Sequence, residues 1–364
     1  MTSAHVEFLR LLAQREAHRH RARLAALFQG ASDCVIGGFR LADETFVKEL
    51  STQTLYLLLA ENDPARAGRL PASPDAKNQI RSLAQLRDGL AERQAMIRTL
   101  PNHHAKYWCK GFDDDATPLG VLFSGDLTPS SLDPEDPAGN SHEFLLELDA
   151  AESAELAKYI RWMMGNRPAT DILPRKDLHH AGGLAKCPRF DHLLLTQPSK
   201  TLAQAILDLI KGAERSIVLS MWAMSVDTAV FTALKQATSH KRVLLLIHDD
   251  SANRTAIDEL QSAGAEVRLC PKMHAKLWLA DREHRPHAIV SSANLLRDGM
   301  EAGYELGVRL DGDDARMPAV LNFFDSRWEF AIKPTPPRPS SARAVTSLGE
   351  LSKVVRVEPP LRIF

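Results

Sequence analysis

Cysteine and long apolar runs are scarce in this sequence, and both scarcities limit what the protein can be. Its four cysteines are scattered without a C-x-x-C spacing, which argues against a disulfide framework and against a zinc site. No run of about 18 apolar residues is present, and the first residues lack the charged region and apolar stretch of an export signal. We therefore expect a cytoplasmic protein without integral membrane contact.

A strong net charge is also absent. The 364 residues include 45 Lys and Arg against 46 Asp and Glu, a net charge of -1, so no overall field attracts a polyanion. A nucleic acid would have to meet a local basic patch, and the segments 18–23 and 235–242 are the candidates. The plainer interpretation of each segment is a solvated helix face, because clustered Lys and Arg are common on helices.

The most informative feature that is present is an internal repeat. The tripeptide His-Ala-Lys occurs at 104–106 and again at 274–276, and each copy is followed two residues later by Trp. After each copy come a short apolar run with a Ser-containing polar cluster and then a Glu that leads an apolar strand, Glu143 and Glu305. One order of residue types used twice predicts a duplicated half-site.

Strand and helix patterns alternate over most of the chain. Helical periodicity predicts a helix over 5–28 and another over 76–100, and a Pro-rich surface loop is expected over 61–75. Strands that alternate with helices between 202 and 270 are typical of an α/β lobe with a sheet covered on both faces. The length predicts two similar lobes. The expected organisation is an N-terminal helix in 1–29, a first lobe in 30–170, an inter-lobe connection in 171–200, a second lobe in 201–333 and a Pro-rich tail in 334–364.

The residue types of the repeat fit phosphoryl-transfer chemistry. Alternate side chains of a strand share a face, so His274 and Lys276 are expected to point the same way, as are His104 and Lys106. A buried lysine is costly unless it lines a cleft that holds an anion, and an imidazole titrates near neutral pH. Each repeat is therefore expected to contribute to a site for a phosphate group.

The polar residues downstream of each copy would complete that site. Ser292 and Asn294 offer a hydroxyl and an amide to phosphate oxygens. Glu305 is expected to accept a hydrogen bond from one ring nitrogen of His274 and to fix its tautomer. The corresponding residues of the first copy are Ser124, Asp126 and Glu143.

Two such half-sites placed face to face would form a covalent phosphodiesterase. One histidine would attack phosphorus, and the other, protonated, would supply a proton to the leaving oxygen while the lysines neutralise the equatorial oxygens. This chemistry requires no metal and no cofactor. Both halves carry the same residue types, so the sequence does not distinguish the nucleophilic histidine from the acid.

The second copy resembles the signature of the phospholipase D superfamily. The family's HxKxxxxD and GSxN motifs correspond to 274–281 and 291–294, and the resemblance extends over roughly 30–165 and 200–332. It implies an α/β fold of two similar lobes, each a mixed sheet flanked by helices, related by a pseudo-twofold axis. It also implies one site at the lobe interface and a phosphohistidine intermediate formed without a metal.

The first copy departs from this signature at two positions. Gly111 replaces the signature aspartate, which the second copy retains as Asp281. Asp281 is an odd number of residues from Lys276, so on a strand it would point away from the histidine, which favours a structural role. The acidic residues 113–115 are candidates for that role in the first lobe. Asp126 replaces the asparagine, and a carboxylate repels phosphate. Either Asp126 turns aside or the first half-site binds the ester differently.

Other aromatic and histidine residues have plainer expected roles. Trp108 and Trp278 are expected to pack in the core, with stacking against a base as the alternative. His103, His179 and His180 are expected to be polar loop groups.

The repeat identifies a phosphodiester but not what the ester joins. The basic N-terminal helix, and the lack of a clearly membrane-binding amphipathic segment, favour DNA or RNA over lipid. Similar two-copy proteins include bacterial DNA-processing and phage-defence nucleases. The alternatives are a phospholipid hydrolase or transphosphatidylase, and a noncatalytic nucleic-acid-binding scaffold with a decayed first half-site. A monomer suffices for the site, and protein partners of a multi-component system are left open.

Overall fold

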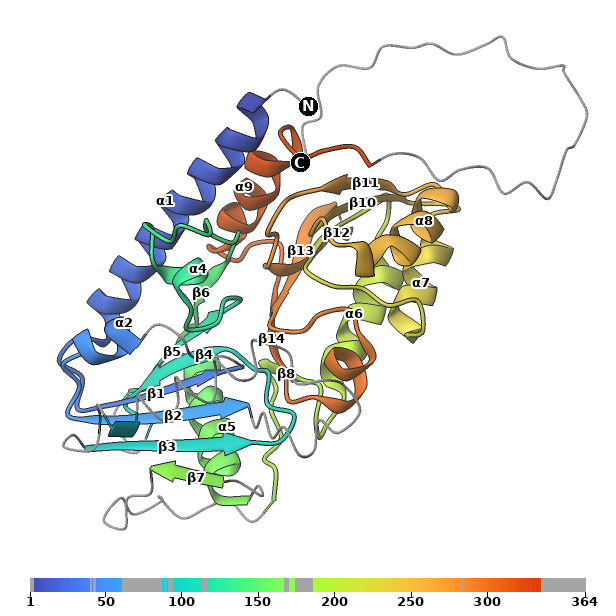
Figure 1. Ribbon diagram of the computed structural model, residues 1–364. Coiled ribbons are helices and arrows are strands. Elements are labelled where there is room, and N and C mark those ends of the chain that lie inside the picture. Colours follow the sequence, from blue (N-terminus) through green and yellow to red (C-terminus); the bar gives the residue numbers. More distant parts are fainter. Residues whose placement is uncertain are drawn as a thin grey trace, which may run out of the picture.

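The computed structural model describes residues 3–39, 41, 44–60, 87–88, 90, 94–112, 117–166, 170–173, 186–282 and 284–334. The loop expected over 61–75, the acidic residues 113–115, the pair His179 and His180, and the Pro-rich tail beyond residue 334 lie outside this part of the chain. The described residues form two mixed sheets with flanking helices (Figure 1).

Each half of the chain contributes a sheet that has seven strands within the described residues. The strands of the first sheet are β1 (Asp33–Gly38), β2 (Thr54–Ala60), β3 (Gln94–Leu100), β4 (Tyr107–Lys110), β5 (Leu119–Phe123), β6 (Leu145–Glu147) and β7 (Thr170–Leu173). The strands of the second sheet are β8 (Leu193–Leu195), β9 (Ser216–Met221), β10 (Arg242–Ile247), β11 (Glu266–Leu269), β12 (Lys276–Arg282), β13 (Arg285–Ser291) and β14 (Leu306–Leu310).

The two sheets share one topology over six strands. The first has the order β6-β5-β4-β1-β2-β3-β7 and the second β11-β10-β9-β12-β13-β14-β8. In each sheet three parallel neighbours, β1 to β3 and β9 to β11, are joined to an antiparallel strand, β4 or β12, that follows the His-Ala-Lys segment. The seventh strands differ, because β7 pairs with β3 whereas β8 pairs with β14. The duplication seen in the motifs therefore extends to the fold.

Helices flank both sheets, and most arise where the sequence pattern predicts them. The helix expected over 5–28 is confirmed as α1, whereas residues 94–100, expected to be helical, form β3. The buried side chains of Ala95, Met96 and Ile97 are held there by parallel pairing with β2, so tertiary packing outweighs local propensity. The helices are α1 (Ser3–Phe28), α2 (Glu44–Glu49), α4 (Pro129–Leu132), α5 (Ala150–Asn166), α6 (Thr201–Gly212), α7 (Ala229–Ala237), α8 (Arg254–Ser262) and α9 (Met317–Trp328), with a 3₁₀ turn at Ser251–Asn253 and a π-helical turn at Asp298–Ala302.

The two lobes share buried structure rather than meeting at a polar surface. One apolar cluster contains residues of both halves, and within it the rings of Phe144 and Phe323 lie 5.6 Å apart. Helix α1 packs along α9 (Figure 1), where Phe8 stacks on Phe330 at 3.9 Å and Glu16 pairs with the buried Arg327. Segments from opposite ends of the chain thus fix the lobes relative to each other, which positions the site between them.

Candidate active site at the lobe interface

The two His-Ala-Lys segments meet the opposite lobe through matching backbone hydrogen bonds. The amide of His104 and the amide after it donate to the carbonyl of Tyr304 at 3.1 and 2.7 Å. The amide of His274 and the amide after it donate to the carbonyl of His142 at 3.0 and 2.9 Å. Each histidine is therefore tied to the residue that precedes the glutamate of the other lobe.

As a result, the glutamate of each lobe contacts the histidine of the other lobe. Glu305 Oε1 lies 2.6 Å from His104 Nδ1, and Glu143 Oε1 lies 2.9 Å from His274 Nδ1. The expectation that Glu305 orients His274 is therefore wrong: it orients the histidine of the first lobe. Because each carboxylate holds Nδ1, Nε2 is the ring nitrogen available for chemistry, and in His104 this atom lies 3.2 Å from Lys106 Nζ.

Glu143 is a fully buried carboxylate that collects several donors. It accepts hydrogen bonds from Ser124 at 2.6 Å, Ser131 at 3.1 Å and Ser141 at 2.8 Å. Burial by itself would raise the pKa of Glu143, but the nearby His274 and other positive and hydroxyl groups outweigh burial and lower it. Glu143 is thus a permanent anion that holds the imidazole in one orientation.

Glu305 occupies the equivalent position in the second lobe. Ser292 donates to it at 2.5 Å, and its pKa is lowered because the charges of His104 and Lys106 outweigh the opposing effect of burial. The hydroxyl of Ser292 also accepts from the amide of Leu306 at 3.1 Å, as Ser124 does from its counterpart at 2.7 Å. In this arrangement the serines brace the glutamates, and direct phosphate binding by their hydroxyls stays a prediction.

The two histidines are accessible, unlike their carboxylate partners. The side chains of His104 and His274 are 23% and 17% exposed, whereas those of Glu305 and Glu143 are 3% and 1% exposed. Burial lowers the pKa of His274, and the adjacent Glu143 offsets part of that shift. Each ring therefore has a buried carboxylate partner and is itself partly exposed.

The two lysines have different surroundings. Lys106 Nζ lies 3.0 Å from the carbonyl of His104 and 3.6 Å from Asp126 Oδ1. Lys276 Nζ is fully buried and has no hydrogen-bond partner among the described residues. Burial and the charge of Lys106 lower the pKa of Lys276 to about 7. The second half-site therefore presents a buried amine without a hydrogen-bond partner among the described residues, and a bound anion would supply that partner and stabilise the charged form.

Lys276 is expected to lower the stability of the folded protein although the proposed reaction needs it. The free energy of unfolding of the Lys276→Met variant is expected to be about 1–3 kcal/mol higher at pH 6 than that of the unmodified protein, because a buried unpaired charge is removed. The folded pKa is lowered, so the cost of the native lysine is fully present below pH 7 and fades as the pH rises toward its unfolded value of about 10.4. Urea unfolding at pH 6 and pH 9 measures the gain. Equal stability of both proteins at pH 6 would contradict it.

Asp126 does not turn away from the site. Its carboxylate accepts from the amide of Phe39 at 3.0 Å and faces Lys106. Burial would raise the pKa of Asp126, but the charges of Lys106, His104 and His274 outweigh burial and lower it. The first half-site therefore contains an ionised carboxylate where the family signature has an amide.

The other departure, Gly111, is compensated from a different strand. In the second lobe Asp281 is buried on β12 and accepts from the amides of Arg215 and Ser216 at 3.0 and 2.8 Å, which gives it the structural role that parity predicts. In the first lobe the carboxylate stands on the neighbouring strand: Asp33, at the start of β1, accepts from the amide of Gly111 at 2.6 Å. Asp33 was not predicted from the sequence, because the second lobe has no acidic residue at the equivalent start of β9.

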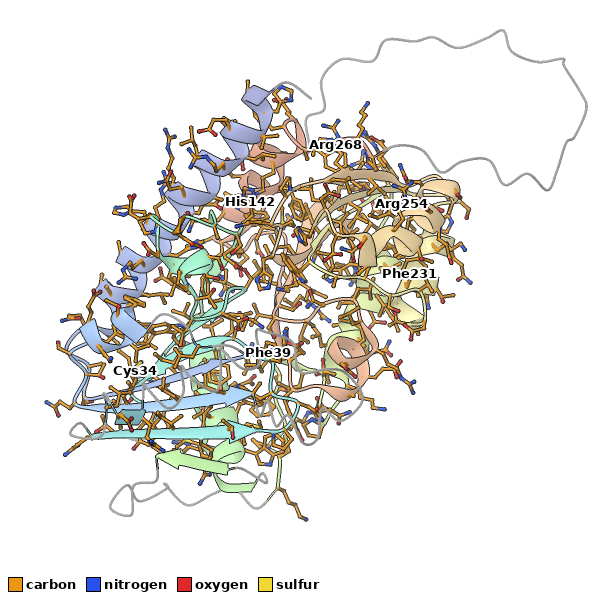
Figure 2. The ribbon with its side chains drawn as sticks, viewed as in Figure 1. Cys34, Phe39, His142, Phe231, Arg254 and Arg268 are labelled. Carbon is orange, nitrogen blue, oxygen red and sulfur yellow. The ribbon has the colours of Figure 1, made fainter. Side chains whose placement is uncertain are left out.

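An aromatic side chain flanks each histidine. Phe39 follows β1 and lies 4.9 Å from the ring of His104, while Trp222 follows β9 and lies 5.1 Å from the ring of His274. Phe39 lies at the end of β1 toward the second lobe (Figure 2). Both rings are half-buried. Neither residue was predicted from the sequence, although the two share a signal: each directly follows the corresponding strand, β1 or β9.

Trp222 also lines a pocket of about 200 Å³ beside His274. Its indole stacks at 3.8 Å on His248, whose Nδ1 accepts from the amide of Lys272. Lys272 and Asp126 line the same pocket. The catalytic crevice therefore has one aromatic wall and charged groups of both signs.

The remaining aromatic and histidine predictions have mixed outcomes. Trp108 and Trp278 are buried in the apolar cores, as the packing interpretation predicts. His103 was expected to be a polar loop group, and this is wrong. Its ring is fully buried edge-on against Tyr107, and burial lowers the pKa of His103 to about 3.

Comparison with known proteins gives a family match for the second lobe and structural likenesses for the fold. Residues 206–328 match the family described as "Cardiolipin synthase, PLD-like domain". The chain is similar in structure to phosphatidylserine synthase from Haemophilus influenzae Rd KW20, with 13% identity, a TM-score of 0.60, and coverage of 87% of this chain and 86% of that one. No curated protein matches the sequence.

Weaker structural likenesses extend to other proteins. Polyphosphate kinase from Porphyromonas gingivalis matches 83% of this chain at 15% identity with a TM-score of 0.49, and this chain spans 47% of its length. Nuc from Salmonella typhimurium, titled a phospholipase D family member, matches 39% of this chain and 95% of its own at 17% identity and a TM-score of 0.35.

The family match in the second lobe and the shared two-lobe fold support membership of the phospholipase D superfamily. The expected fold class, two similar phospholipase D-like lobes with mixed sheets and flanking helices, is confirmed. Members of this superfamily are phosphodiesterases and phosphotransferases, and the specific activity of this chain is a separate question.

Proposed function

We propose that this protein is a phosphodiesterase that works through a covalent phosphohistidine, and that its substrate is DNA or RNA. The observation that carries the proposed reaction is the exchange of carboxylates: two accessible imidazoles, each held at Nδ1 by a buried glutamate of the other lobe. The catalytic residues are His104, Lys106, Glu143, His274, Lys276 and Glu305.

The reaction follows from this geometry in two steps. Nε2 of one histidine attacks phosphorus and the bond to the leaving oxygen breaks, while the other histidine donates its Nε2 proton to that oxygen. A water then attacks the phosphohistidine, losing its proton to the second histidine, and the P–N bond breaks. Both imidazoles carry positive charge at some stage, which the buried Glu143 and Glu305 stabilise.

The aromatic side chains near the two histidines support a nucleic-acid substrate. Phe39 and Trp222 lie beside the two histidines, and aromatic rings bind single-stranded bases by stacking regardless of sequence. A base attached to the reacting phosphate would lie within reach of such a ring. The favoured substrate is therefore a strand with unpaired bases at the reacting phosphate.

The basic segments that favoured nucleic acid at the sequence level are largely neutralised. Arginines and lysines of 18–23 and 235–242 form ion pairs with glutamates of neighbouring elements, so these segments offer little free positive charge to a phosphate backbone. The pairs are Arg21–Glu49, Arg23–Glu147, Lys235–Glu259 and Arg242–Glu266, at 2.7, 2.6, 2.9 and 2.8 Å. We expect recognition of a few nucleotides at the site rather than a long electrostatic footprint.

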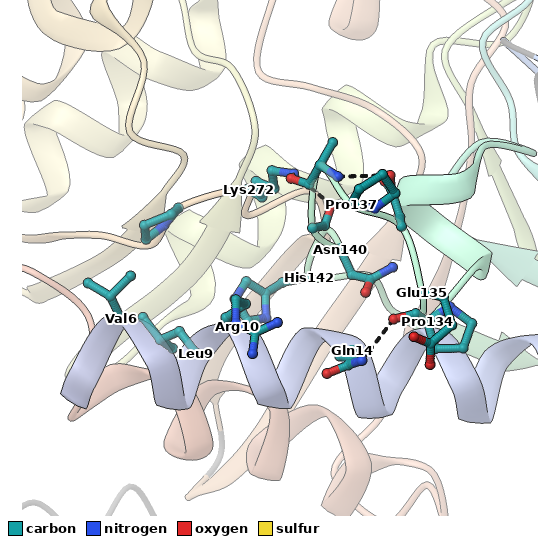
Figure 3. A pocket seen from close by; sticks show the side chains of 14 residues that line it. Val6, Leu9, Arg10, Gln14, Pro134, Glu135, Pro137, Asn140, His142 and Lys272 are labelled. Carbon is teal, nitrogen blue, oxygen red and sulfur yellow. Dashed lines mark hydrogen bonds between the residues drawn. The ribbon is translucent and has the colours of Figure 1, made fainter. Parts of the chain in front are cut away.

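A lipid substrate is the second candidate, because an apolar pocket adjoins the site. The pocket has a volume of about 460 Å³ and lies between α1 and the segment 134–140 (Figure 3). Val6, Leu9 and Pro271 contribute apolar surface, and Lys272 lines both this pocket and the catalytic one. An acyl chain there would place its phosphate near His274. In the part of the chain that the structure describes, no helix has the length and apolarity needed to cross a membrane.

One assay separates these readings. Purified protein in EDTA is incubated with labelled single- and double-stranded DNA, RNA and short-chain phosphatidylcholine, beside a variant that lacks both histidines. Cleavage of nucleic acid only by the unmodified protein supports the nuclease. Release of choline instead supports the lipid enzyme, and binding without turnover of any substrate supports the noncatalytic scaffold.

Trp222 provides a prediction specific to nucleic acid. The Trp222→Ala variant is expected to raise KM for single-stranded DNA about tenfold or more, because base stacking contributes about 1–3 kcal/mol. Trp222→Phe retains a stacking face and is the matched control, expected to lie close to the unmodified protein. Equal KM for the Ala and Phe variants would remove the stacking argument and with it the main support for nucleic acid. A role in bacterial DNA processing or phage defence stays a prediction.

A further inference from the structure

The two half-sites carry different charge where their sequences differ. In the second, Lys276 Nζ and Asn294 Oδ1 are buried without hydrogen-bond partners among the described residues. In the first, Lys106 faces the carboxylate of Asp126 at 3.6 Å. An anion in the second half-site would therefore meet a lysine without a hydrogen-bond partner in the described part of the chain, whereas in the first half-site the lysine already faces a carboxylate.

Asp126 also lies close enough to act on the whole crevice. It lines the catalytic pocket together with His274 and Glu143, and its charge interacts with Lys276 and with both histidines. The site thus contains three buried carboxylates, Asp126, Glu143 and Glu305, against two lysines. An asparagine at position 126 would make the same site more positive by one charge.

This charge balance bears on which phosphate esters the site can hold. A phosphodiester carries one negative charge, whereas a phosphomonoester has a second pKa near 6 and is a dianion at pH 8. In a buried, low-dielectric site an extra carboxylate penalises the second charge more than it would in water. Asp126 is held in place by the amide of Phe39, so it cannot easily swing away from such a ligand.

We propose that Asp126 restricts this site to singly charged phosphodiesters by repelling dianionic phosphomonoesters. The inference rests on the proposed function, because hydrolysis of a diester produces a monoester. Repulsion of that dianion by Asp126 then promotes release of the product. Asp126, which departs from the family signature, would then determine specificity, and its presence would not mean that the first half-site has lost its function.

The test measures anion affinity, which needs no turnover. Tungstate, a stable dianion, and dimethyl phosphate, a monoanion, are titrated at pH 8 by calorimetry into the full chain and three variants. Asp126→Asn is expected to bind tungstate about tenfold tighter or more, with a smaller change for dimethyl phosphate. Asp126→Glu keeps the charge and is expected to retain the unmodified protein's weaker binding. Asp313→Asn removes one exposed charge beyond the far end of β14 and is expected to change neither.

The outcomes distinguish this inference from the proposed function. Tungstate affinities of Asp126→Asn and the unmodified protein that agree within about twofold overturn it, as does a gain that Asp126→Glu shares. Diester turnover is assayed in parallel on the same proteins. Tighter tungstate binding by Asp126→Asn without any diester turnover supports the charge role of Asp126 and rejects the proposed phosphodiesterase. Diester turnover with an unchanged tungstate affinity supports the phosphodiesterase and rejects the charge role.

Discussion

The His104→Ala and His274→Ala variants are each expected to lose about 10⁴-fold or more in diester hydrolysis. One imidazole forms the covalent bond and the other transfers the proton, and residues that act as such a unit are each indispensable. The double variant is expected to be no worse than either single one. Rates are measured with purified protein in EDTA, and His240→Ala, on the exposed surface of the second lobe, is the matched control.

The same pair of variants identifies the nucleophile. With an activated ester that needs no proton on its leaving group, the variant that lacks the acid still forms a phosphohistidine and hydrolyses it slowly. The variant that lacks the nucleophile forms none. Acid-quenched protein labelled at phosphorus, followed by peptide mapping, reads out the difference. Substantial hydrolysis of an ordinary diester, whose leaving group needs a proton, by either alanine variant would reject the covalent mechanism.

The exchange of glutamates between lobes leads to the second large effect. Glu143→Gln is expected to lower kcat by about 10²–10⁴-fold, because a neutral amide neither stabilises the imidazolium nor fixes the tautomer. Glu305→Gln is expected to act similarly from the other lobe. Glu259→Gln makes the same change in an exposed ion pair and is expected to be silent.

The exchange itself is visible without any assay of activity. In Glu143→Gln the ring ¹⁵N shifts of His274 are expected to move while those of His104 stay, and in Glu305→Gln the reverse is expected. Lower pKa values for His274 accompany the first change, because the negative charge that raises it is gone. Perturbation of the histidine from the same lobe as the altered glutamate would contradict the geometry.

Parts of the site were predictable because they depend on local chemistry. Strand parity gave Asp281 a structural role on β12, since alternation is a property of any strand. The prediction of a helix over 76–100 is wrong at 94–100, because pairing with β2 makes that segment a strand. Asp33 was not predicted, because a carboxylate on either of two neighbouring strands can accept a hydrogen bond from the other strand's backbone.

The order of motifs by itself determined the duplicated fold, the residue types of the site and the superfamily, because these follow from side-chain chemistry and spacing along one chain. Only the tertiary structure decided which glutamate serves which histidine. The carbonyls of Tyr304 and His142 bind the opposite lobe's backbone, so the partners are set by register across the interface and not by distance in sequence. Only the packed structure, likewise, pairs the basic segments with acids and leaves Asp126 facing Lys106.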